Sequence, residues 1–547
     1  MPETHSLSRP LVAGTRGAVS TCHPLATSVG LEILWRGGNA FDSAVAVAAA
    51  LGVVEPMSCG AGGDVFALCY DAHRNETTAL NAAGAAPFGA HPRQFATGGI
   101  PVHGIRSATV PAAVDGWLAV LERYGSLPAP DVFAPAIAYA EEGFPAGLHD
   151  VAAIDHYAPL LAADPEAAAV FLPEGRPLGL GDRVVQRDLA ATLREIAGGG
   201  RDAFYRGRFA ERLLRQSRAA GGLFAAEDLT LAHASWHEPV ATEYRGYTVY
   251  AQPPVSHGFI LLEALNMLEA YDVRAFGRDD ARLAHCMIEI KKLVFADRHA
   301  YVGDPRQVAV PLDTLLSKRY AAERRAALNM ARAATEVPPG PVPAAAGADT
   351  TYFAVADRGG NLVSFMQSLY RGFGSGVIVA GTGVLLNNRM GGFTRDPRSP
   401  NALGPGRVPV HNMAPNLVGK DGRAFMAVGT PGGYSQVQSN MQVLTNVLDF
   451  GMNVQEAIDA PRWVHGGSTV GGPDAEVTVD PWMPDAVVRG LEERGHRIMV
   501  LGQEPPVPRG HTSEYTTSRV EAVMIDRARG TIFAGADPRS EAQAAAW

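Results

Sequence analysis

Thr350 is the residue of this sequence best placed to carry chemistry, because of what stands on either side of it. A Pro- and Ala-rich arm (about 336–349) precedes it, and a β-prone run follows it. Cleavage of the Asp349-Thr350 bond would leave Thr350 with a free α-amine beside its own hydroxyl. An unperturbed α-amine, with a pKa of roughly 8, accepts the hydroxyl proton at neutral pH and makes the threonine a nucleophile. From this stretch alone, a loop end with a capping hydroxyl is the alternative.

Two glycine clusters suggest other kinds of site. Gly372-Phe373-Gly374-Ser375-Gly376 lies between strand-like runs and opens no helix, so it lacks the context of a phosphate-binding loop. Gly432 and Gly433 precede a run with helical character, 435–448. Their paired N–H groups are suited to an oxyanion hole for an acyl intermediate, and a tight turn is the alternative.

The elements that must position these residues predict layers of helix and sheet. Helices are expected at about 24–36, at 43–51 with Asp42 as the cap, and at 284–301, 454–460 and 485–493. A further helix carries Leu189, Leu193 and Ile196 and should stop at the glycines 198–200. Strands are expected at 18–21, 244–250, 351 to about 386, 424–428 and 520–525. Strand pairs bracketed by helices favour an α+β core over a doubly wound parallel sheet.

Composition excludes several classes of function. The 547 residues suffice for two to four domains or one large layered domain. A net charge of -9 without a long Lys/Arg run argues against nucleic acid as a partner. The four cysteines form no CxxC pair, which disfavours a disulfide framework and a zinc site. The absence of an apolar stretch of about 18 residues, and of an apolar region within residues 1–16, predicts a cytoplasmic protein without a membrane segment.

Taken together, the motifs resemble the gamma-glutamyltranspeptidase family of N-terminal nucleophile hydrolases, over about residues 14–540. The matching motifs are Gly37-Gly38-Asn39-Ala40 with Asp42, Gly62-Gly63, 182–205, Tyr244-Arg245-Gly246-Tyr247, Ala296-Asp297-Arg298, Gly303-Asp304-Pro305, Thr350-Thr351, Leu385-Leu386-Asn387-Asn388, Thr430-Pro431-Gly432-Gly433 and Ala536-Asp537-Pro538-Arg539.

The resemblance implies a four-layer αββα sandwich whose precursor cuts itself. A large subunit, 1–349, and a small subunit, 350–547, would together form one catalytic core. Thr350 would be the nucleophile of both self-cleavage and catalysis. Ser368 falls where the family has a threonine beside the nucleophile and would orient it, and Gly432 and Gly433 fall on the oxyanion-hole glycines. No metal or organic cofactor is implied.

The departures from the family concern the substrate pocket. The arginine that clamps a γ-glutamyl carboxylate would lie near Ala83, where the sequence has none. The family's asparagine falls on Tyr370, its aspartate on Gly392, and its two serines on His411 and Asn412. A zwitterionic head without ionic partners binds poorly, because charged groups are costly to desolvate.

The pocket instead gains Tyr370, Arg371, His411, Asn412 and, as a further candidate, Arg389. Arginine suits bidentate contact with a carboxylate, so a small carboxylate-bearing amide is the expected substrate. His411 has no second ligand at a supporting spacing, so a metal site is not expected.

The sequence therefore predicts a self-processing threonine amide hydrolase that resembles oxamate amidohydrolases. Two alternatives within the family are a gamma-glutamyltransferase or glutathione hydrolase with an altered pocket, and a cephalosporin or glutaryl acylase. An unprocessed, non-catalytic binding protein is the alternative of another class.

Overall fold

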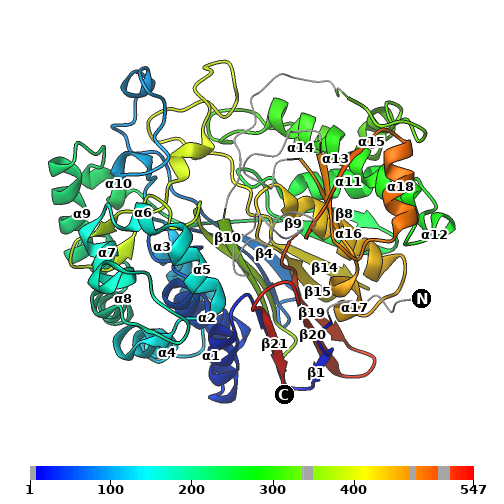
Figure 1. The fold of residues 1–547 in the computed structure, drawn as a ribbon. Helices are drawn as coiled ribbons and strands as arrows, with labels where there is room; N and C mark the ends of the chain where they lie inside the picture. The colour runs from blue at the N-terminus through cyan, green and yellow to red at the C-terminus, as the bar shows by residue number, and fades with distance from the viewer. Residues whose placement is uncertain (1–7, 336, 338–348, 467–475, 503–517) are drawn as a thin grey trace.

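The computed structural model describes residues 8–335, 337, 349–466, 476–502 and 518–547. Its centre is a pair of seven-stranded antiparallel sheets (Figure 1). The first sheet has the order β21 (Gln543–Ala546), β2 (Gly17–Thr21), β10 (Asp349–Asp357), β11 (Leu362–Tyr370), β3 (Asp64–Asp71), β4 (Glu76–Ala82) and β7 (Ser235–His237). The second has the order β1 (Val12–Gly14), β20 (Thr531–Ala536), β19 (Glu521–Asp526), β15 (Arg423–Gly429), β14 (Asn416–Lys420), β9 (Tyr247–Ala251) and β8 (Val240–Tyr244).

Side-chain alternation along the strands divides the interior into layers. On β10, Tyr352 and Ala354 point into a core shared by the two sheets, whereas Phe353 and Val355 point into a core shared with helices. Successive residues of a strand face opposite sides, so a strand buried on both faces is apolar throughout. The second sheet adds a third core, in which Val428 of β15 packs against helices.

Helices cover the outer face of each sheet, on the left and right in Figure 1. Those over the first sheet include α1 (Pro24–Trp35), α2 (Ala40–Val54), α3 (Ala113–Tyr124), α4 (Ala129–Glu142) and α8 (Arg187–Tyr205). Those on the side of the second include α11 (Phe259–Leu268), α13 (Ala281–Tyr301), α16 (Ser435–Leu448), α17 (Val454–Asp459) and α18 (Asp485–Glu493). The four-layer αββα sandwich is therefore confirmed.

Shorter elements complete the described chain. They are β5 (Phe144–Pro145), α5 (Leu148–His156), α6 (Ala158–Leu161), α7 (Pro165–Phe171), β6 (Arg183–Val184), α9 (Arg208–Ala219), α10 (Ala226–Thr230), α12 (Val273–Phe276), α14 (Leu312–Leu315), α15 (Lys318–Arg325), β12 (Ile378–Val379), β13 (Val384–Leu385), β16 (Trp463–His465), β17 (Glu476–Val479) and β18 (Arg497–Val500), with 3-10 turns η1 (Pro92–Phe95), η2 (Ile105–Ser107), η3 (Pro173–Gly175) and η4 (Arg389–Gly392).

One predicted helix start was wrong. Helix α2 begins earlier than expected, with Asn39 as its N-cap, and Asp42 completes the capping box from the first turn. The predicted stop at the glycines 198–200 agrees with the backbone of α8, where Gly200 has a φ of +61° and a ψ of -149° and separates two helical segments. Glycine adopts such a conformation at little steric cost. Buried apolar residues on both sides of this kink hold the two segments against the core.

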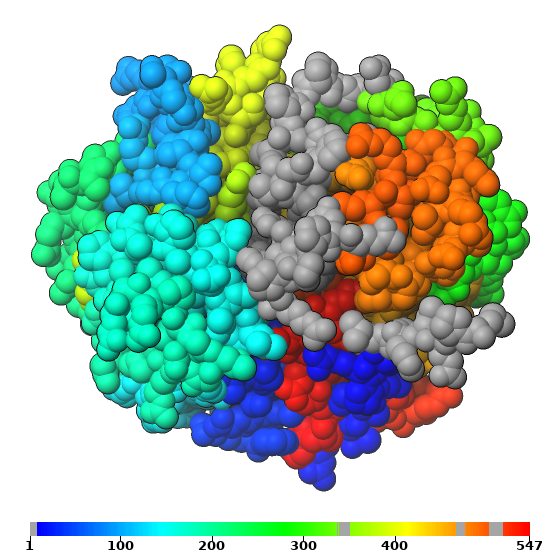
Figure 2. Space-filling view, viewed as in Figure 1, coloured from blue at the N-terminus to red at the C-terminus, as the bar shows by residue number. Residues whose placement is uncertain are grey.

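Segments from both ends of the chain are interleaved in the two sheets. Strand β10 lies between β2 and β11, and β1 pairs with β20. Accordingly, blue amino-terminal atoms adjoin red carboxyl-terminal atoms on the lower part of the face in Figure 2. A cut at the Asp349-Thr350 bond would therefore divide the chain without dividing the sheets; the two-subunit boundary itself stays a prediction. Among the described residues, no helix is long and apolar enough to cross a membrane.

Candidate active site

Thr350 lies at the start of β10, in a local irregularity of the sheet. The pairing of β10 with β11 shifts register between Asp349 and Thr351, as a β-bulge does. A bulge re-aims the side chain of the extra residue. The Thr350 side chain is buried, and its Oγ1 donates a hydrogen bond to Ser368 Oγ over 3.3 Å. The two hydroxyls that the sequence analysis paired are thus brought together from adjacent strands.

Ser368 stands near the end of β11, where the strand leaves the sheet. Its Oγ also accepts a hydrogen bond from the Tyr370 backbone N–H over 2.8 Å. Tyr370 has a φ of +88°, a region that non-glycine residues rarely adopt and that is tolerated at over-determined functional sites. The turn after β11 therefore fixes the Ser368 hydroxyl beside Thr350.

A buried carboxylate connects the residue after Thr350 to the glycine loop. Thr351 Oγ1 donates to Glu55 Oε2 over 2.7 Å, and Glu55 Oε1 accepts from Ser58 Oγ over 3.1 Å. Arg519 places its guanidinium 3.5 Å from Glu55 Oε1, while its backbone N–H donates to Thr430 Oγ1 over 3.0 Å. Burial raises the pKa of Glu55, and Arg519 opposes that rise. No role was predicted for Glu55 from the sequence, although it stands in a glycine-rich segment.

The glycine loop joins β15 to α16 and has a left-handed backbone at two residues. Gly432 has a φ of +111° and Gly433 a φ of +59°. The Ser435 N–H and Oγ both donate to the Gly432 carbonyl, over 3.0 and 2.8 Å. This arrangement turns the loop tightly before the first turn of α16, so glycine is required there.

Packing between the sheets brings the glycine loop toward the start of β10. A Cβ built on Gly429, the last residue of β15, would lie 2.3 Å from the ring of Tyr352. Tyr352 is two residues beyond Thr350, and Gly429 is three residues before Gly432. The oxyanion-hole assignment of Gly432 and Gly433 stays a prediction.

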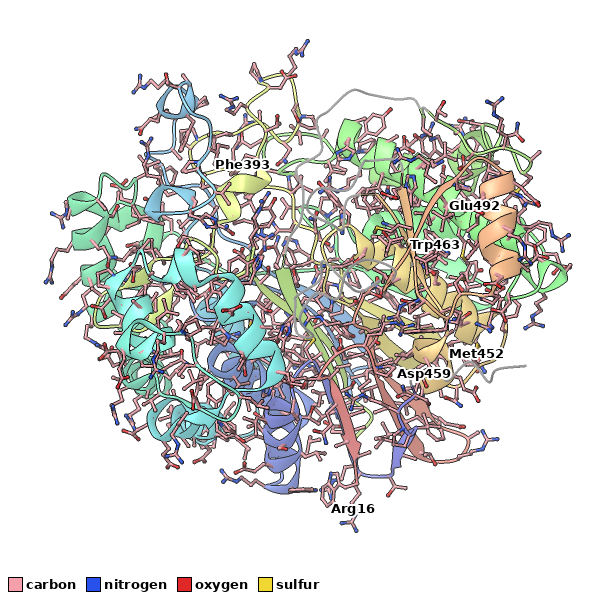
Figure 3. The ribbon with its side chains drawn as sticks, viewed as in Figure 1. Arg16, Phe393, Met452, Asp459, Trp463 and Glu492 are labelled. Carbon is pink, nitrogen blue, oxygen red and sulfur yellow. The ribbon has the colours of Figure 1, made fainter. Side chains whose placement is uncertain are left out.

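A cavity of about 490 Å³ lies next to these elements. It is lined by the turn after β11, by η4 and the loop beyond it, by the end of α13 and by Tyr434, the last residue before α16. The predicted catalytic residues Thr350, Ser368, Gly432 and Gly433 are not among the lining residues. Figure 3 labels Phe393, one of its lining residues, on the segment that follows η4. A volume of this size is typical of small-molecule sites. The lining residues are Ile100, Pro101, Val102, Arg298, His299, Val302, Tyr370, Arg371, Asn388, Gly391, Gly392, Phe393, Thr394, Arg395, Asp396, Ser399, Asn401, Val410, Asn412 and Tyr434.

The predicted substrate ligands divide into two groups. Tyr370, Arg371 and Asn412 line the cavity. His411 and Arg389 are fully buried and lie outside the lining. Their contact with substrate stays a prediction, and the structure gives both of them a protein partner.

That partner is Asp64, the first residue of β3, which the sequence analysis did not single out. Asp64 Oδ2 lies 3.1 Å from Arg389 Nε and 3.4 Å from His411 Nε2, and Oδ1 accepts from the Gly84 N–H over 2.7 Å. Burial alone would raise the pKa of Asp64, but His411 and Arg389 hold it below its usual value. Burial lowers the pKa of His411, and Arg389 adds to that effect. Asp64 pairs in register with Ser368, so this ionic cluster adjoins the hydroxyl partner of Thr350.

One cluster outside the cavity has metal-ligand residue types. The ligand atoms of His285, Glu289 and His496 lie within 4.8 Å of one another. His285 Nδ1 is already 2.8 Å from His496 Nε2, and Lys292 Nζ donates to Glu289 Oε1 over 2.6 Å. The two histidines are hydrogen-bonded to each other, and the Glu289 carboxylate already holds Lys292. These contacts favour a structural role for the three side chains over a cation site.

Comparisons with known proteins agree with this geometry. A family model described as Gamma-glutamyltranspeptidase matches residues 26–547. The glutathione hydrolase-like YwrD proenzyme of Bacillus subtilis (strain 168) is 37% identical over 535 residues, covering 97% of this chain and 99% of that protein. The acylase ACY 1 proenzyme of Pseudomonas sp. (strain SE83) is 37% identical, covering 89% and 88%. A solved structure of cephalosporin acylase from Bacillus halodurans has a TM-score of 0.89 at 36% identity and covers 100% of this chain and 99% of that one.

The match extends over nearly the whole chain in sequence and in structure. It includes both sheets and the helices outside them. This chain belongs to the gamma-glutamyltranspeptidase family of N-terminal nucleophile hydrolases.

Proposed function

We propose that Thr350 cuts its own precursor and then serves as the nucleophile of an amide hydrolase. The observation that carries this proposal is the buried Thr350 hydroxyl at the start of β10, bonded to Ser368 Oγ at 3.3 Å. In self-cleavage, Thr350 Oγ1 attacks the Asp349 carbonyl carbon. The C–N bond breaks, the nitrogen takes the hydroxyl proton, and an ester joins the two segments. Water then hydrolyses the ester and leaves Thr350 with a free α-amine.

The same groups would serve the substrate. The α-amine takes the Thr350 hydroxyl proton as Oγ1 attacks the amide carbonyl, and it passes that proton to the departing amine. The N–H groups of Gly432 and Gly433 would hold the oxyanion of the tetrahedral intermediate, and Ser368 would orient Thr350. Water resolves the acyl-enzyme and releases the acid.

The charge around the cavity supports a substrate whose acyl group bears a carboxylate. Arg298 and Arg371 line the cavity, whereas the lining acid Asp396 is bonded to Arg398 over 2.7 Å. The positions that clamp a γ-glutamyl head hold Ala83 and Gly392, neither of which carries a charge. The volume of the cavity and the likeness to acylases favour a larger acid amide, such as a glutaryl amide, over oxamate, the smallest amide of this class.

Glutathione hydrolysis or γ-glutamyl transfer is the second candidate. The name of the Bacillus subtilis relative favours it, and the uncharged residues at positions 83 and 392 count against it. Turnover of a γ-glutamyl anilide at a rate above that of a glutaryl anilide would establish it.

Intact-mass spectrometry of the purified protein tests the proposal. We expect two fragments that meet at Asp349/Thr350 in the wild type and one uncut chain in Thr350→Ala. Thr351→Ala is the matched control, because Thr351 is the neighbouring buried hydroxyl but bonds to Glu55, so this variant should still cut. An uncut wild-type chain that is folded would refute the mechanism and favour a non-catalytic binding protein.

The processed protein is then tested on oxamate, glutaryl amides and γ-glutamyl amides. Hydrolysis of a carboxylate-bearing amide, absent in Thr350→Ala, is the expected result. Self-cleavage without turnover of any of these amides would support Thr350 as the nucleophile of self-cleavage but reject the proposed substrate class.

A further inference from the structure

Arg298 is a buried cation in the wall of the cavity. It lies one turn before the end of α13, and its side chain is only 8% exposed. The guanidinium stacks over Tyr434, with its central carbon 5.1 Å from the ring centroid. Tyr434 follows Gly433 directly and also lines the cavity, so Arg298 stands next to the glycine loop.

The hydrogen-bond partners of Arg298 are all neutral acceptors. Nε donates to His257 Nδ1 over 3.1 Å, Nη2 donates to Asn412 Oδ1 over 2.8 Å, and Nη1 lies 3.4 Å from His299 Nδ1. A guanidinium has five N–H donors, so two or more remain beyond these contacts. Asn412, the most closely bonded of the three partners, is itself a cavity residue.

Within the described part of the chain, no carboxylate forms an ion pair with Arg298. The nearest acid in sequence, Asp297, is bonded instead to Arg324 over 2.9 Å. The buried Arg389, by contrast, has Asp64 as its counter-ion. Desolvated arginines in proteins are normally paired, because an uncompensated buried charge is costly.

The two flanking histidines also remain uncharged beside this cation. Burial lowers the pKa of His299 to about 3, with Arg298 as the next cause. Burial and Arg298 likewise hold the pKa of His257 well below its usual value. Both rings are therefore neutral acceptors at neutral pH, and the positive charge of Arg298 faces the cavity without an anion from the described residues to balance it.

We propose that Arg298 binds the carboxylate of the substrate's acyl group, with Asn412 holding the guanidinium in place. The proposal rests on the proposed amide hydrolase function and assigns its specificity to a residue of α13. An anion from the ligand supplies the counter-charge that the described residues do not provide, and a guanidinium presents paired donors to a carboxylate. Arg371 and Arg389, which the sequence favoured, are secondary in this view.

The test uses one amide in two charge states: glutaryl p-nitroanilide and its methyl ester. In the processed Arg298→Gln variant, KM for the acid should rise by about 10- to 100-fold, with kcat changed far less. KM for the ester should change by no more than about threefold. In Arg298→Lys, KM for the acid should lie between the values of the wild type and of Arg298→Gln, because lysine keeps the charge but not the paired donors.

Arg282→Gln is the matched control, since Arg282 lies on the same helix but is solvent-exposed and bonded to Asp280. Its kinetics should equal those of the wild type. Self-cleavage reports folding in every variant. If the Arg298→Gln chain stays uncut, the comparison uses Arg298→Lys alone. In that variant, KM must still rise more for the acid than for the ester.

Binding of glutarate, measured by calorimetry, separates this inference from the proposed function. Glutarate affinity that falls in Arg298→Gln but not in Arg282→Gln supports the anion site even if no anilide is hydrolysed. Equal rises in KM for the acid and the ester, or glutarate binding that does not depend on Arg298, would overturn the assignment of Arg298.

Discussion

The buried pair of Asp64 and Arg389 gives a strong prediction about stability. The side chains of Arg389 and Asp64 are 1% and 0% exposed, and Arg389 Nε lies 3.1 Å from Asp64 Oδ2. Asp64→Asn keeps the shape of the side chain and an acceptor for the Gly84 N–H but removes the negative charge. The guanidinium would remain buried without a counter-ion, because arginine cannot be deprotonated. We expect the free energy of unfolding to fall by about 3–5 kcal/mol.

The converse variant, Arg389→Gln, should cost less. Without Arg389, His411 and the Gly84 N–H remain to oppose the effect of burial, so the pKa of Asp64 should rise and the carboxyl can take a proton more readily. The unfolded state keeps an ordinary Asp pKa, so the cost of Arg389→Gln should be largest at pH 7 and should shrink as the pH falls toward 4. The double variant should be less destabilised than the sum of the two single variants by more than about 1 kcal/mol.

The assay is urea unfolding at pH 7 in a Thr350→Ala background, which keeps the chain uncut and avoids subunit dissociation. Salt should change the results little, since a buried pair is screened far less than an exposed one. A loss below about 1 kcal/mol for Asp64→Asn, or strict additivity in the double variant, would refute the account of the pair.

Two further predictions concern the glycine loop and Glu55. Gly432→Ala places a Cβ 2.4 Å from Ser435 Oγ at a φ of +111°, and we expect kcat to fall by about 100-fold or more as the loop N–H groups move. Gly451→Ala is the control, because Gly451 has a φ of +71° and open space around it; this variant should lose stability but keep kcat. Equal kcat values in the two variants would contradict the role of the loop. Glu55→Gln should gain stability relative to the wild type as the pH rises from 4 to 8, because the folded-state pKa of Glu55 is raised and its ionisation costs free energy. Unfolding curves at both pH values measure this, and a constant difference would contradict it.

Much of the fold could be predicted from local signals. The β-prone run after Thr350 and the run after Gly433 are contiguous features, and they form β10 and α16 as predicted. The predicted arm of about 336–349 lies, except for residues 337 and 349, outside the described residues. The error at Asn39 was also local in kind. Asn39 and Asp42 together form the capping box, so the helix begins before Asp42 and not after it.

The sequence by itself determined the residue types and the order of the candidate catalytic segments, because a strand start, a tight turn and a layered core follow from neighbouring residues. The partners of the buried charges were decided by the tertiary structure alone. Asp64 and Arg389 are 325 positions apart, and Arg298 and Asn412 are 114 apart. Local pattern carries no information about such pairs, since they depend on how strands and helices from distant segments pack. For the same reason, the sequence pointed to Arg371 and Arg389. The fold places Arg298 beside Arg371 in the cavity lining, with no counter-ion for Arg298 among the described residues.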